Sequence, residues 1–317
     1  LLEKDIALGT ALVNMYAKCG NFVEAQEVFD ELLVRNTVSW NVLISGYVGH
    51  GEGMKAMGSF EVMLCEGLSP DTVTYVCILK ICGTMQDLAK GKQIHYRITQ
   101  ESLLGKDIVL GNALINMYAK CGELQRAQQV MEKIPVRDAI SWSTLIARYA
   151  ELGQHKEALK SFEHMLNEGH SPDVVTFISI LKACTSAGAI DKGKEIHDEV
   201  TRRGWLEKNI VLGNTLVDMY AKCGMLAKAK QVLERLPVRD VVSWNVLIAG
   251  YGQQGDIQGA VMSFQKLKDD GLYPDAITFV CMLQACGISG TVGKGKHIHE
   301  EIISRGLDKD LVIGTAV

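Results

Sequence analysis

Apolar residues recur along this chain with the spacing of amphipathic helices that come in pairs. In the segment 139–173 the first apolar stripe falls at i, i+3, i+4 and i+7 and consists of Trp142, Leu145, Ile146 and Tyr149. Gly153 interrupts the pattern, a second stripe runs over 158–166, and Gly169 and Pro172 mark its end. This pattern predicts two helices joined by a short turn.

The helix pair belongs to a repeat. The string Met-Tyr-Ala-Lys-Cys-Gly and the dipeptide Ser-Trp both recur in steps of 102 residues, at Met15, Met117 and Met219 and at Trp40, Trp142 and Trp244. Because 102 residues exceed one supersecondary element, the period is divided into repeats of 35, 36 and 31 residues. Complete repeats then run over 6–36, 37–71, 72–107, 108–138, 139–173, 174–209, 210–240, 241–275 and 276–310, with a partial repeat over 311–317. A helix pair cannot bury both its faces alone, so we predict an all-α stack of such pairs around a continuous core.

The composition excludes several classes of protein. With 317 residues, 47% hydrophobic, 22% charged and five prolines, the chain is too long for one small fold and too apolar for a disordered linker. Its 33 basic and 37 acidic residues give a net charge of −4, so nucleic-acid binding would have to rest on local pattern. No apolar run is long enough for a transmembrane helix. The nine cysteines include no C-x-x-C pair, which predicts reduced thiols, with Cys19, Cys121 and Cys223 buried at helix ends.

The chain begins at Leu1 without a presequence and ends seven residues into a repeat. We therefore expect a piece of a longer protein, with any targeting peptide outside this sequence.

Two-helix repeats of about 34 residues are typical of both tetratricopeptide and pentatricopeptide arrays. The alternation of 35, 36 and 31 residues, with the phrases Val-Ser-Trp-Asn, Met-Tyr-Ala-Lys-Cys-Gly and Lys-Gly-Lys followed by Ile-His, resembles the plant PLS class of pentatricopeptide repeat proteins over residues 1–317. The resemblance implies one array folded as a right-handed α-solenoid superhelix. It also implies an RNA-binding factor of chloroplast or mitochondrion that specifies a site for C-to-U editing or other transcript processing. Single-stranded organellar RNA would be its partner, editing-complex proteins could join it, and no membrane or cofactor is implied.

In that family the fifth and the last residue of each repeat read one base. The residues that match these positions are Thr10 with Asn36, Asn41 with Asp71, Asn112 with Asp138, Ser143 with Asp173, Asn214 with Asp240, and Asn245 with Asp275. The resemblance assigns uridine to the Asn–Asp pairs, guanine to the Ser–Asp pair and adenine to the Thr–Asn pair. The 36-residue repeats carry Val76, Ile178 and Val280 at the fifth position and should discriminate weakly. The alternative is that these Asn and Asp residues cap helices.

Two further sets of residues match the family. Aliphatic second residues, which the family wedges between bases, are Val38, Val109, Ile140, Val211 and Val242, with Val73, Val175 and Ile277 at the same position. Packing in the core explains them equally well. Lys18, Lys120 and Lys222, the thirteenth residues of the 31-residue repeats, resemble phosphate contacts, although a solvated lysine is the alternative.

Signals for catalysis are incomplete. His197-x-Glu199 matches half of a zinc deaminase signature, but the Pro-Cys-x-x-Cys half does not occur. The G-x-x-x-x-G-K match at Gly188 lacks the Ser or Thr that would hold magnesium. We therefore expect no catalytic residues, no metal and no enzymatic activity in this chain, since the deaminase-like domain of the family would follow such an array. The competing hypothesis is a helical scaffold that binds a protein partner in the same groove.

Overall fold

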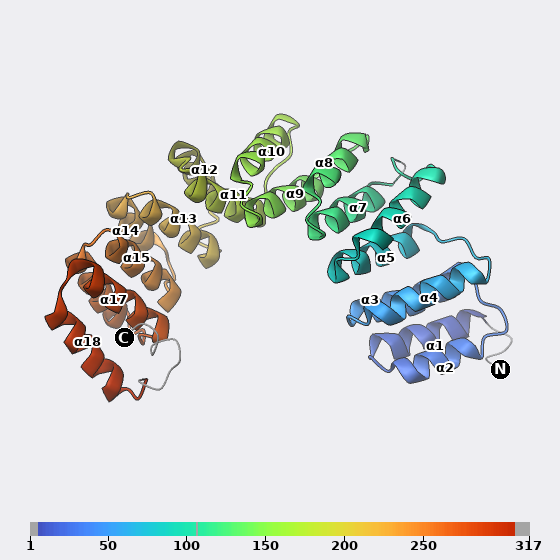
Figure 1. Cartoon of the computed structure of the whole chain (residues 1–317), viewed down its shortest axis with the longest axis horizontal. Helices are drawn as coiled ribbons and strands as arrows, with labels where there is room; N and C mark the ends of the chain where they lie inside the picture. Colours follow the sequence, from blue (N-terminus) through green and yellow to red (C-terminus); the bar gives the residue numbers. More distant parts are fainter. Residues whose placement is uncertain (1–5, 106, 308–317) are drawn as a thin grey trace. The chain divides into compact units, whose positions relative to one another are not determined.

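The first helix of each complete repeat begins at the first residue of that repeat and ends at a turn with positive φ, which a glycine occupies in every one of these repeats except 72–107, where Gln86 does. The structure is a computed structural model that describes residues 6–105 and 107–307, and within these residues every regular element is an α-helix. The chain divides into two compact parts, residues 1–152 with α1 to α9 and residues 153–317 with α10 to α18 (Figure 1). In the N-terminal part the helices are α1 (Ile6–Lys18), α2 (Phe22–Asp30), α3 (Thr37–Gly49), α4 (Gly53–Cys65), α5 (Thr72–Met85), α6 (Leu88–Gln100), α7 (Ile108–Lys120), α8 (Leu124–Lys133) and α9 (Ala139–Glu151). In the C-terminal part they are α10 (His155–Asn167), α11 (Val174–Ala187), α12 (Ile190–Arg202), α13 (Ile210–Lys222), α14 (Leu226–Arg235), α15 (Val241–Gln253), α16 (Ile257–Asp269), α17 (Ala276–Ser289) and α18 (Val292–Ser304).

Helix length accounts for the three repeat lengths. The second helices α2, α8 and α14 of the 31-residue repeats have nine or ten residues, whereas the other second helices have 13. The first helices α5, α11 and α17 of the 36-residue repeats have 14 residues, one more than the other first helices. The extra residue and the missing turn therefore sit at fixed places in each period.

Within each part the helices form two layers. Odd-numbered helices pack on the next odd-numbered helix, as α3 does on α5 and α15 on α17. Even-numbered helices such as α4 and α16 pack on their own partner and on the next first helix, while α10 contacts α11 and α18 contacts α17. The first helices thus form one layer and the second helices the other. The core between the layers contains the predicted stripe, including Trp142, Leu145, Ile146 and Tyr149 of α9. The all-α repeat fold is confirmed, while the right-handed sense of the superhelix stays a prediction.

A buried tryptophan links neighbouring repeats through a shared carboxylate. The Trp244 indole N–H donates to Asp270 at 3.0 Å, and Arg239 of the preceding repeat donates to the same carboxylate at 2.8 and 3.2 Å. Trp40 and Arg35 donate in the same way to Glu66, at 3.1 and 2.9 Å. The arginine holds the pKa of Asp270 below its usual value. Each such cluster fixes the orientation of one repeat on the next.

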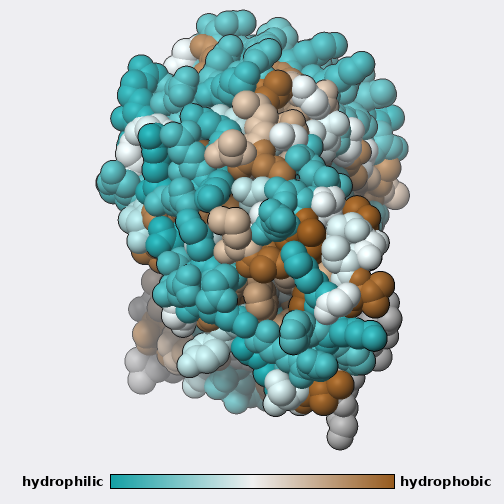
Figure 2. All heavy atoms as spheres, turned by 90° about the vertical axis from the view of Figure 1, so that its left-hand side faces the viewer, coloured by the Kyte–Doolittle hydropathy of each residue, from teal (hydrophilic) through white to brown (hydrophobic). Residues whose placement is uncertain are grey.

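Polar residues predominate on the outside of the C-terminal part. Figure 2 shows the side on which Figure 1 places α14 and α18, where hydrophilic residues surround small apolar patches. None of the helices within the described residues combines the length and the apolar character that a bilayer crossing requires.

Candidate functional site

The last residue of a repeat is the N-cap of the next repeat's first helix. The side chains of Asp71, Asp138, Asp240 and Asp275 accept the backbone N–H of the residue three positions later, at 2.8 to 2.9 Å. Asn36 and Asp173 cap α3 and α11 in the same way. The capping interpretation is therefore correct for the last residue. It does not account for the fifth residue, which lies in the middle of a helix.

The asparagine at the fifth position donates its amide to that capping carboxylate. Four pairs show this bond at between 2.9 and 3.4 Å: Asn41 with Asp71, Asn112 with Asp138, Asn214 with Asp240, and Asn245 with Asp275. The two members lie 26 or 30 residues apart in sequence, and the fold brings them together because the last residue starts the adjacent first helix. Both roles of the aspartate, as cap and as partner of the amide, are thus fulfilled at once.

Two pairs need separate description. Thr10 is half-buried in α1, and Asn36 is exposed at the start of α3. Ser143 belongs to the N-terminal part and Asp173 to the C-terminal part, so the structure places each of them only within its own part. Their use as base-reading pairs stays a prediction.

These hydrogen bonds keep the aspartates ionised. Burial by itself raises the pKa of Asp71, but the backbone N–H of Thr74, the Asn41 amide and the Thr74 hydroxyl outweigh it and hold the pKa below its ordinary value. The pKa values of Asp138, Asp240 and Asp275 are lowered by the same kinds of bonds against the same effect of burial. A carboxylate that is charged can only accept hydrogen bonds, so it holds the N–H end of the amide and repels the oxygen end.

The second residues of the repeats do not pack in the core. Val38, Val73, Val109, Ile140, Val175, Val211, Val242 and Ile277 are between 52% and 65% exposed. At about 100° per residue, helix positions 2, 5, 9 and 13 share one face, opposite the stripe of positions 4, 7, 8 and 11 that is buried. Core packing is therefore wrong as an explanation for these residues, and they lie on the same face as the fifth and thirteenth residues.

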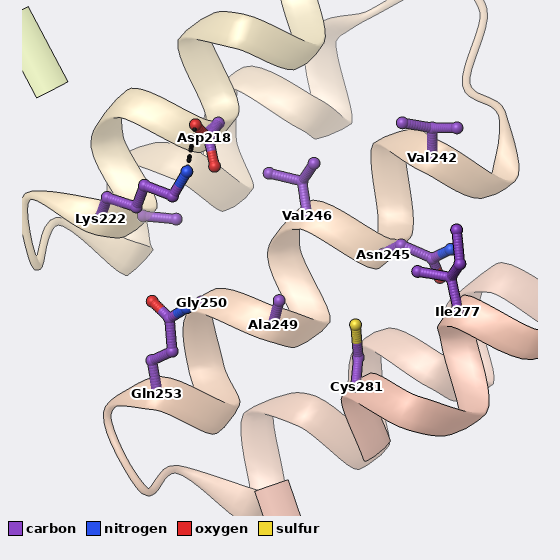
Figure 3. A pocket seen from close by; sticks show the side chains of 11 residues that line it. Asp218, Lys222, Val242, Asn245, Val246, Ala249, Gly250, Gln253, Ile277 and Cys281 are labelled. Carbon is purple, nitrogen blue, oxygen red and sulfur yellow. Dashed lines mark hydrogen bonds and ion pairs between the residues drawn. The ribbon is translucent and has the colours of Figure 1, made fainter. Parts of the chain in front are cut away.

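That face forms a cavity in the C-terminal part. First helices α13, α15 and α17 enclose about 320 Å³, and the lining includes Lys222, Val242, Asn245, Ile277 and Cys281 (Figure 3). Three residues that sequence reasoning assigned to three different roles thus line one cavity. Asn245 is 5% exposed, and its side-chain oxygen has no hydrogen-bond partner among the described residues. An unpaired buried acceptor costs about 1–3 kcal/mol, so this oxygen favours a ligand that donates.

The three lysines have different surroundings. Lys18 is exposed and Lys120 half-buried. Lys222 pairs with Asp218 at 2.9 Å on the same helix, which partly neutralises it at the edge of the cavity (Figure 3). Asn14 and Asn116 occupy the place of Asp218 in the other two 31-residue repeats, so this neutralisation is particular to the third.

His197 of the half signature packs between repeats, and so does His95 at the same place in an earlier repeat. His197 Nδ1 lies 2.9 Å from the Tyr220 hydroxyl, and His95 Nδ1 lies 2.8 Å from the Tyr118 hydroxyl. Burial lowers the pKa of both histidines. Within the described residues no three His, Cys, Asp or Glu side chains come together in the manner of a metal site. Gly188 is the left-handed C-cap of α11, which accounts for its place in the apparent nucleotide-binding motif.

Sequence reasoning was wrong about one set of residues and missed another. Cys19 is exposed and Cys121 and Cys223 are half-buried, because they follow the last buried turn of their helices, whereas Cys82, Cys184 and Cys286 are buried. The missed residues are the buried Ser or Thr side chains at the third position of a repeat, which contact the Asn–Asp pairs. Their alternation with leucine along the chain was the signal that could have identified them.

The fold and this face define an α-helical repeat solenoid with a polar and aliphatic groove. Models of the PPR repeat family match residues 35–84, 137–186 and 239–287, and models of the PPR repeat match 10–37, 112–138, 175–205 and 214–241. The chain belongs to the pentatricopeptide repeat (PPR) family.

Curated relatives agree with this assignment. The mitochondrial pentatricopeptide repeat-containing protein At3g09040 of Arabidopsis thaliana is 37% identical over 98% of this chain and 30% of its own length. The chloroplastic protein At4g18520 of the same plant is 34% identical over 90% of this chain and 46% of its own length. This chain therefore spans less than half of either relative. The expected organellar localisation agrees with these names, which include both organelles.

Among solved structures, the crystal structure of the pentatricopeptide repeat protein PPR10 in complex with an 18-nt psaJ RNA element superposes with a TM-score of 0.79. It is 21% identical to this chain and covers 96% of this chain and 46% of PPR10. This likeness establishes the solenoid fold.

Proposed function

We propose that this chain binds single-stranded RNA in the groove formed by its first helices, with one base facing each repeat. The observation that carries the proposal is the cavity at Asn245, where a buried amide oxygen lacks a partner and exposed aliphatic side chains flank it. Flat apolar base faces suit Val242 and Ile277, and base edges carry the donors and acceptors that an amide can match. Membership of the PPR family and the RNA bound by PPR10 support the same class of ligand.

The geometry of the pair favours uracil over cytosine. Because Asp275 holds the amide nitrogen of Asn245, the amide oxygen is available to accept, and the second N–H is available to donate. Uracil offers an N3–H beside two carbonyl oxygens, which matches this arrangement. A cytosine held in the same position would place its unprotonated N3 against that oxygen, so it would need the amide reversed, with the amide oxygen against the Asp275 carboxylate. The same reasoning applies to Asn214, whose amide oxygen also lacks a partner among the described residues. It applies to Asn41 and Asn112 through the second lone pair of the amide oxygen, since a hydroxyl donates to each of these oxygens.

With the family's assignments for the other pairs, the proposed target reads 5′-A-U-n-U-G-n-U-U-n-3′. Each n faces a 36-residue repeat, whose fifth residue is apolar. The alternation of repeat lengths supports the PLS class, and we propose that the whole protein selects a site for C-to-U editing or other processing of an organellar transcript. Catalysis would then come from another domain or partner.

The net charge of −4 makes base contacts more important than overall attraction to phosphate. Binding to this strand should exceed binding to its complement and to the corresponding duplex, because paired bases cannot present their edges to the groove.

The decisive experiment exchanges one base preference. Asn245→Ser converts its pair with Asp275 into the Ser–Asp type, which should move the preference at base eight from uridine to guanosine by on the order of 1 kcal/mol. Affinities are measured for all four bases at that position at one fixed salt concentration. Val280→Ala, at the fifth position of the next repeat, is the matched control, because it keeps that position apolar, and it should change no preference by a comparable amount.

Two outcomes would contradict the proposal. If Asn245→Ser weakens all four RNAs equally, Asn245 serves packing and not base reading. If the unaltered chain binds this RNA no better than a scrambled strand, the groove serves as a scaffold for a protein partner instead.

A further inference from the structure

A third side chain contacts each of the two Asn–Asp pairs in the N-terminal part. The Thr74 hydroxyl donates to the Asn41 side-chain oxygen at 2.5 Å and lies 3.0 Å from the Asp71 carboxylate. The Ser141 hydroxyl likewise donates to the side-chain oxygen of Asn112 and lies 2.9 Å from Asp138. Both hydroxyl residues are the third residue of the following repeat, and they are 0% and 1% exposed.

In the C-terminal part the same hydroxyls take the other acceptor. Ser243 and Thr278 donate to Asp240 and Asp275, each at 2.8 Å, and the side-chain oxygens of Asn214 and Asn245 have no partner among the described residues. A hydroxyl carries one proton, so it can satisfy the carboxylate or the amide oxygen but not both. The chain therefore shows both hydrogen bonds that this hydroxyl can donate, one to the amide oxygen and one to the carboxylate.

The sequence couples this hydroxyl to the polar fifth residue. The repeats with a polar fifth residue, at Thr10, Asn41, Asn112, Ser143, Asn214 and Asn245, are followed by Ser39, Thr74, Ser141, Thr176, Ser243 and Thr278 at the third position of the next repeat. The repeats with Val76 and Ile178 at the fifth position are followed by Leu110 and Leu212.

Helix capping does not explain this coupling. Asp107 caps α7 through the Val109 backbone, and Asn209 caps α13 through the Leu212 backbone, although leucine occupies the third position in both repeats. The bond from the cap side chain to the backbone is therefore formed with or without the hydroxyl. Ser39, Thr74, Ser243 and Thr278 also accept the backbone N–H of the cap residue. This second capping bond does not explain why leucine replaces the hydroxyl after the repeats whose fifth residue is Val76 or Ile178. Its role is tied to the fifth residue.

We propose that the Ser or Thr at the third position is a positioning residue for base reading in the preceding repeat, an inference that rests on the proposed RNA-binding function. In the arrangement seen at Asn41 and Asn112 its hydroxyl donates to the amide oxygen, which then does not remain unpaired. In the arrangement seen at Asn214 and Asn245 the hydroxyl donates to the carboxylate and leaves the amide oxygen open to a donor. When a base N–H takes that oxygen, the hydroxyl turns to the capping carboxylate. In both states the amide keeps its nitrogen toward the aspartate, so the hydroxyl reinforces the orientation that accepts uracil and opposes the reversed orientation that cytosine needs.

The test compares uridine and cytidine at base two, which faces Asn41. Thr74→Val replaces the hydroxyl by a methyl group of similar size and should lower the ratio of uridine to cytidine affinity by roughly three- to ten-fold, the value of one ordinary hydrogen bond. Thr74→Ser restores the hydroxyl and should recover the unaltered ratio. Thr215→Val is the matched control, since Thr215 is 9% exposed and its hydroxyl donates to the Val211 backbone carbonyl at 2.7 Å.

Thermal unfolding of each variant reports separately on stability, and the affinity ratio is taken within one folded variant. If Thr74→Val weakens uridine and cytidine binding to the same extent, the hydroxyl is merely structural and this inference is overturned. If the unaltered chain shows no preference for uridine at base two, the proposed function of that repeat fails and this inference fails with it. A ratio that falls in Thr74→Val and recovers in Thr74→Ser supports both.

Discussion

Shortening Val242 to alanine separates the two roles that an aliphatic residue can have at the start of a helix. Val242 is the second residue of its repeat, is 54% exposed and lines the cavity that contains Asn245. If the cavity receives a base, the side chain becomes buried only when RNA is bound. Val242→Ala should then weaken RNA binding while leaving the stability of the free chain almost unchanged.

The magnitude follows from the area that the base would cover. Full burial is worth about 0.8 kcal/mol per CH₂ group, and the substitution removes two methyl groups that a base covers on one side only. We expect a loss of about 1 kcal/mol, or roughly five-fold in affinity. The free chain should lose less than about 0.5 kcal/mol, because the removed atoms are largely exposed and alanine favours helix.

The assay pairs RNA titration with urea unfolding for the same protein samples. Val232→Ala is the matched control, since Val232 lies in α14 and is 3% exposed, and it should cost about 1–3 kcal/mol of stability. The loss of affinity in Val242→Ala should be similar for every base at position eight, in contrast to the exchange of preference in Asn245→Ser. A Val242→Ala variant that is destabilised as strongly as Val232→Ala, or that binds RNA with unchanged affinity, would refute this reasoning.

Two further predictions concern the contacts between repeats. Asp270→Ala leaves the buried Trp244 indole N–H without an acceptor and removes a partly exposed ion pair with Arg239, so it should lower the free energy of unfolding in urea by about 2–3 kcal/mol. Glu234→Ala breaks only an exposed ion pair with a lysine and should lower it by less than about 1 kcal/mol. Burial lowers the pKa of His197 in the folded chain below its value in the unfolded chain, and the charges of Lys228 and Arg235 lower it further. The folded state therefore favours the neutral imidazole ring. Its contribution to stability is then complete above the unfolded pKa of about 6.5 and is lost as the pH falls through the folded pKa. The drop in urea midpoint between pH 7.5 and pH 5 should therefore be smaller in His197→Gln, and an unchanged drop would contradict the assignment.

Periodicity was sufficient to predict the helices, because each repeat carries its own apolar stripe and all complete repeats except 72–107 carry a glycine at the turn between their helices. It could not decide whether Val242 and its equivalents pack in the core, since β-branched residues suit a core and a base-binding face equally. The decision required the register of the helix, which places the second residue opposite the buried stripe. Exposure then follows from the helical angle and not from residue type.

Contacts between repeats were the hardest part to predict. The partner of His197 is Tyr220, which lies 23 residues further along the chain and in another repeat, so a local motif such as His-x-Glu suggested the wrong chemistry. The third-position hydroxyls were missed for the same reason. Each belongs to one repeat by sequence and acts on the previous one in space, so its meaning appears only when residues are compared across a repeat boundary.

Capping and base reading were treated as competing explanations of the Asp residues, but under the proposed function each would depend on the other. Asp275 has a fixed position because it caps α17, and its fixed carboxylate in turn orients the Asn245 amide. A carboxylate that rotated freely would favour neither orientation of the amide, and an amide that flipped freely could not distinguish uracil from cytosine. A substitution that weakens the cap should therefore reduce base discrimination before it reduces affinity. Under the proposed function, capping would then be a condition for base specificity.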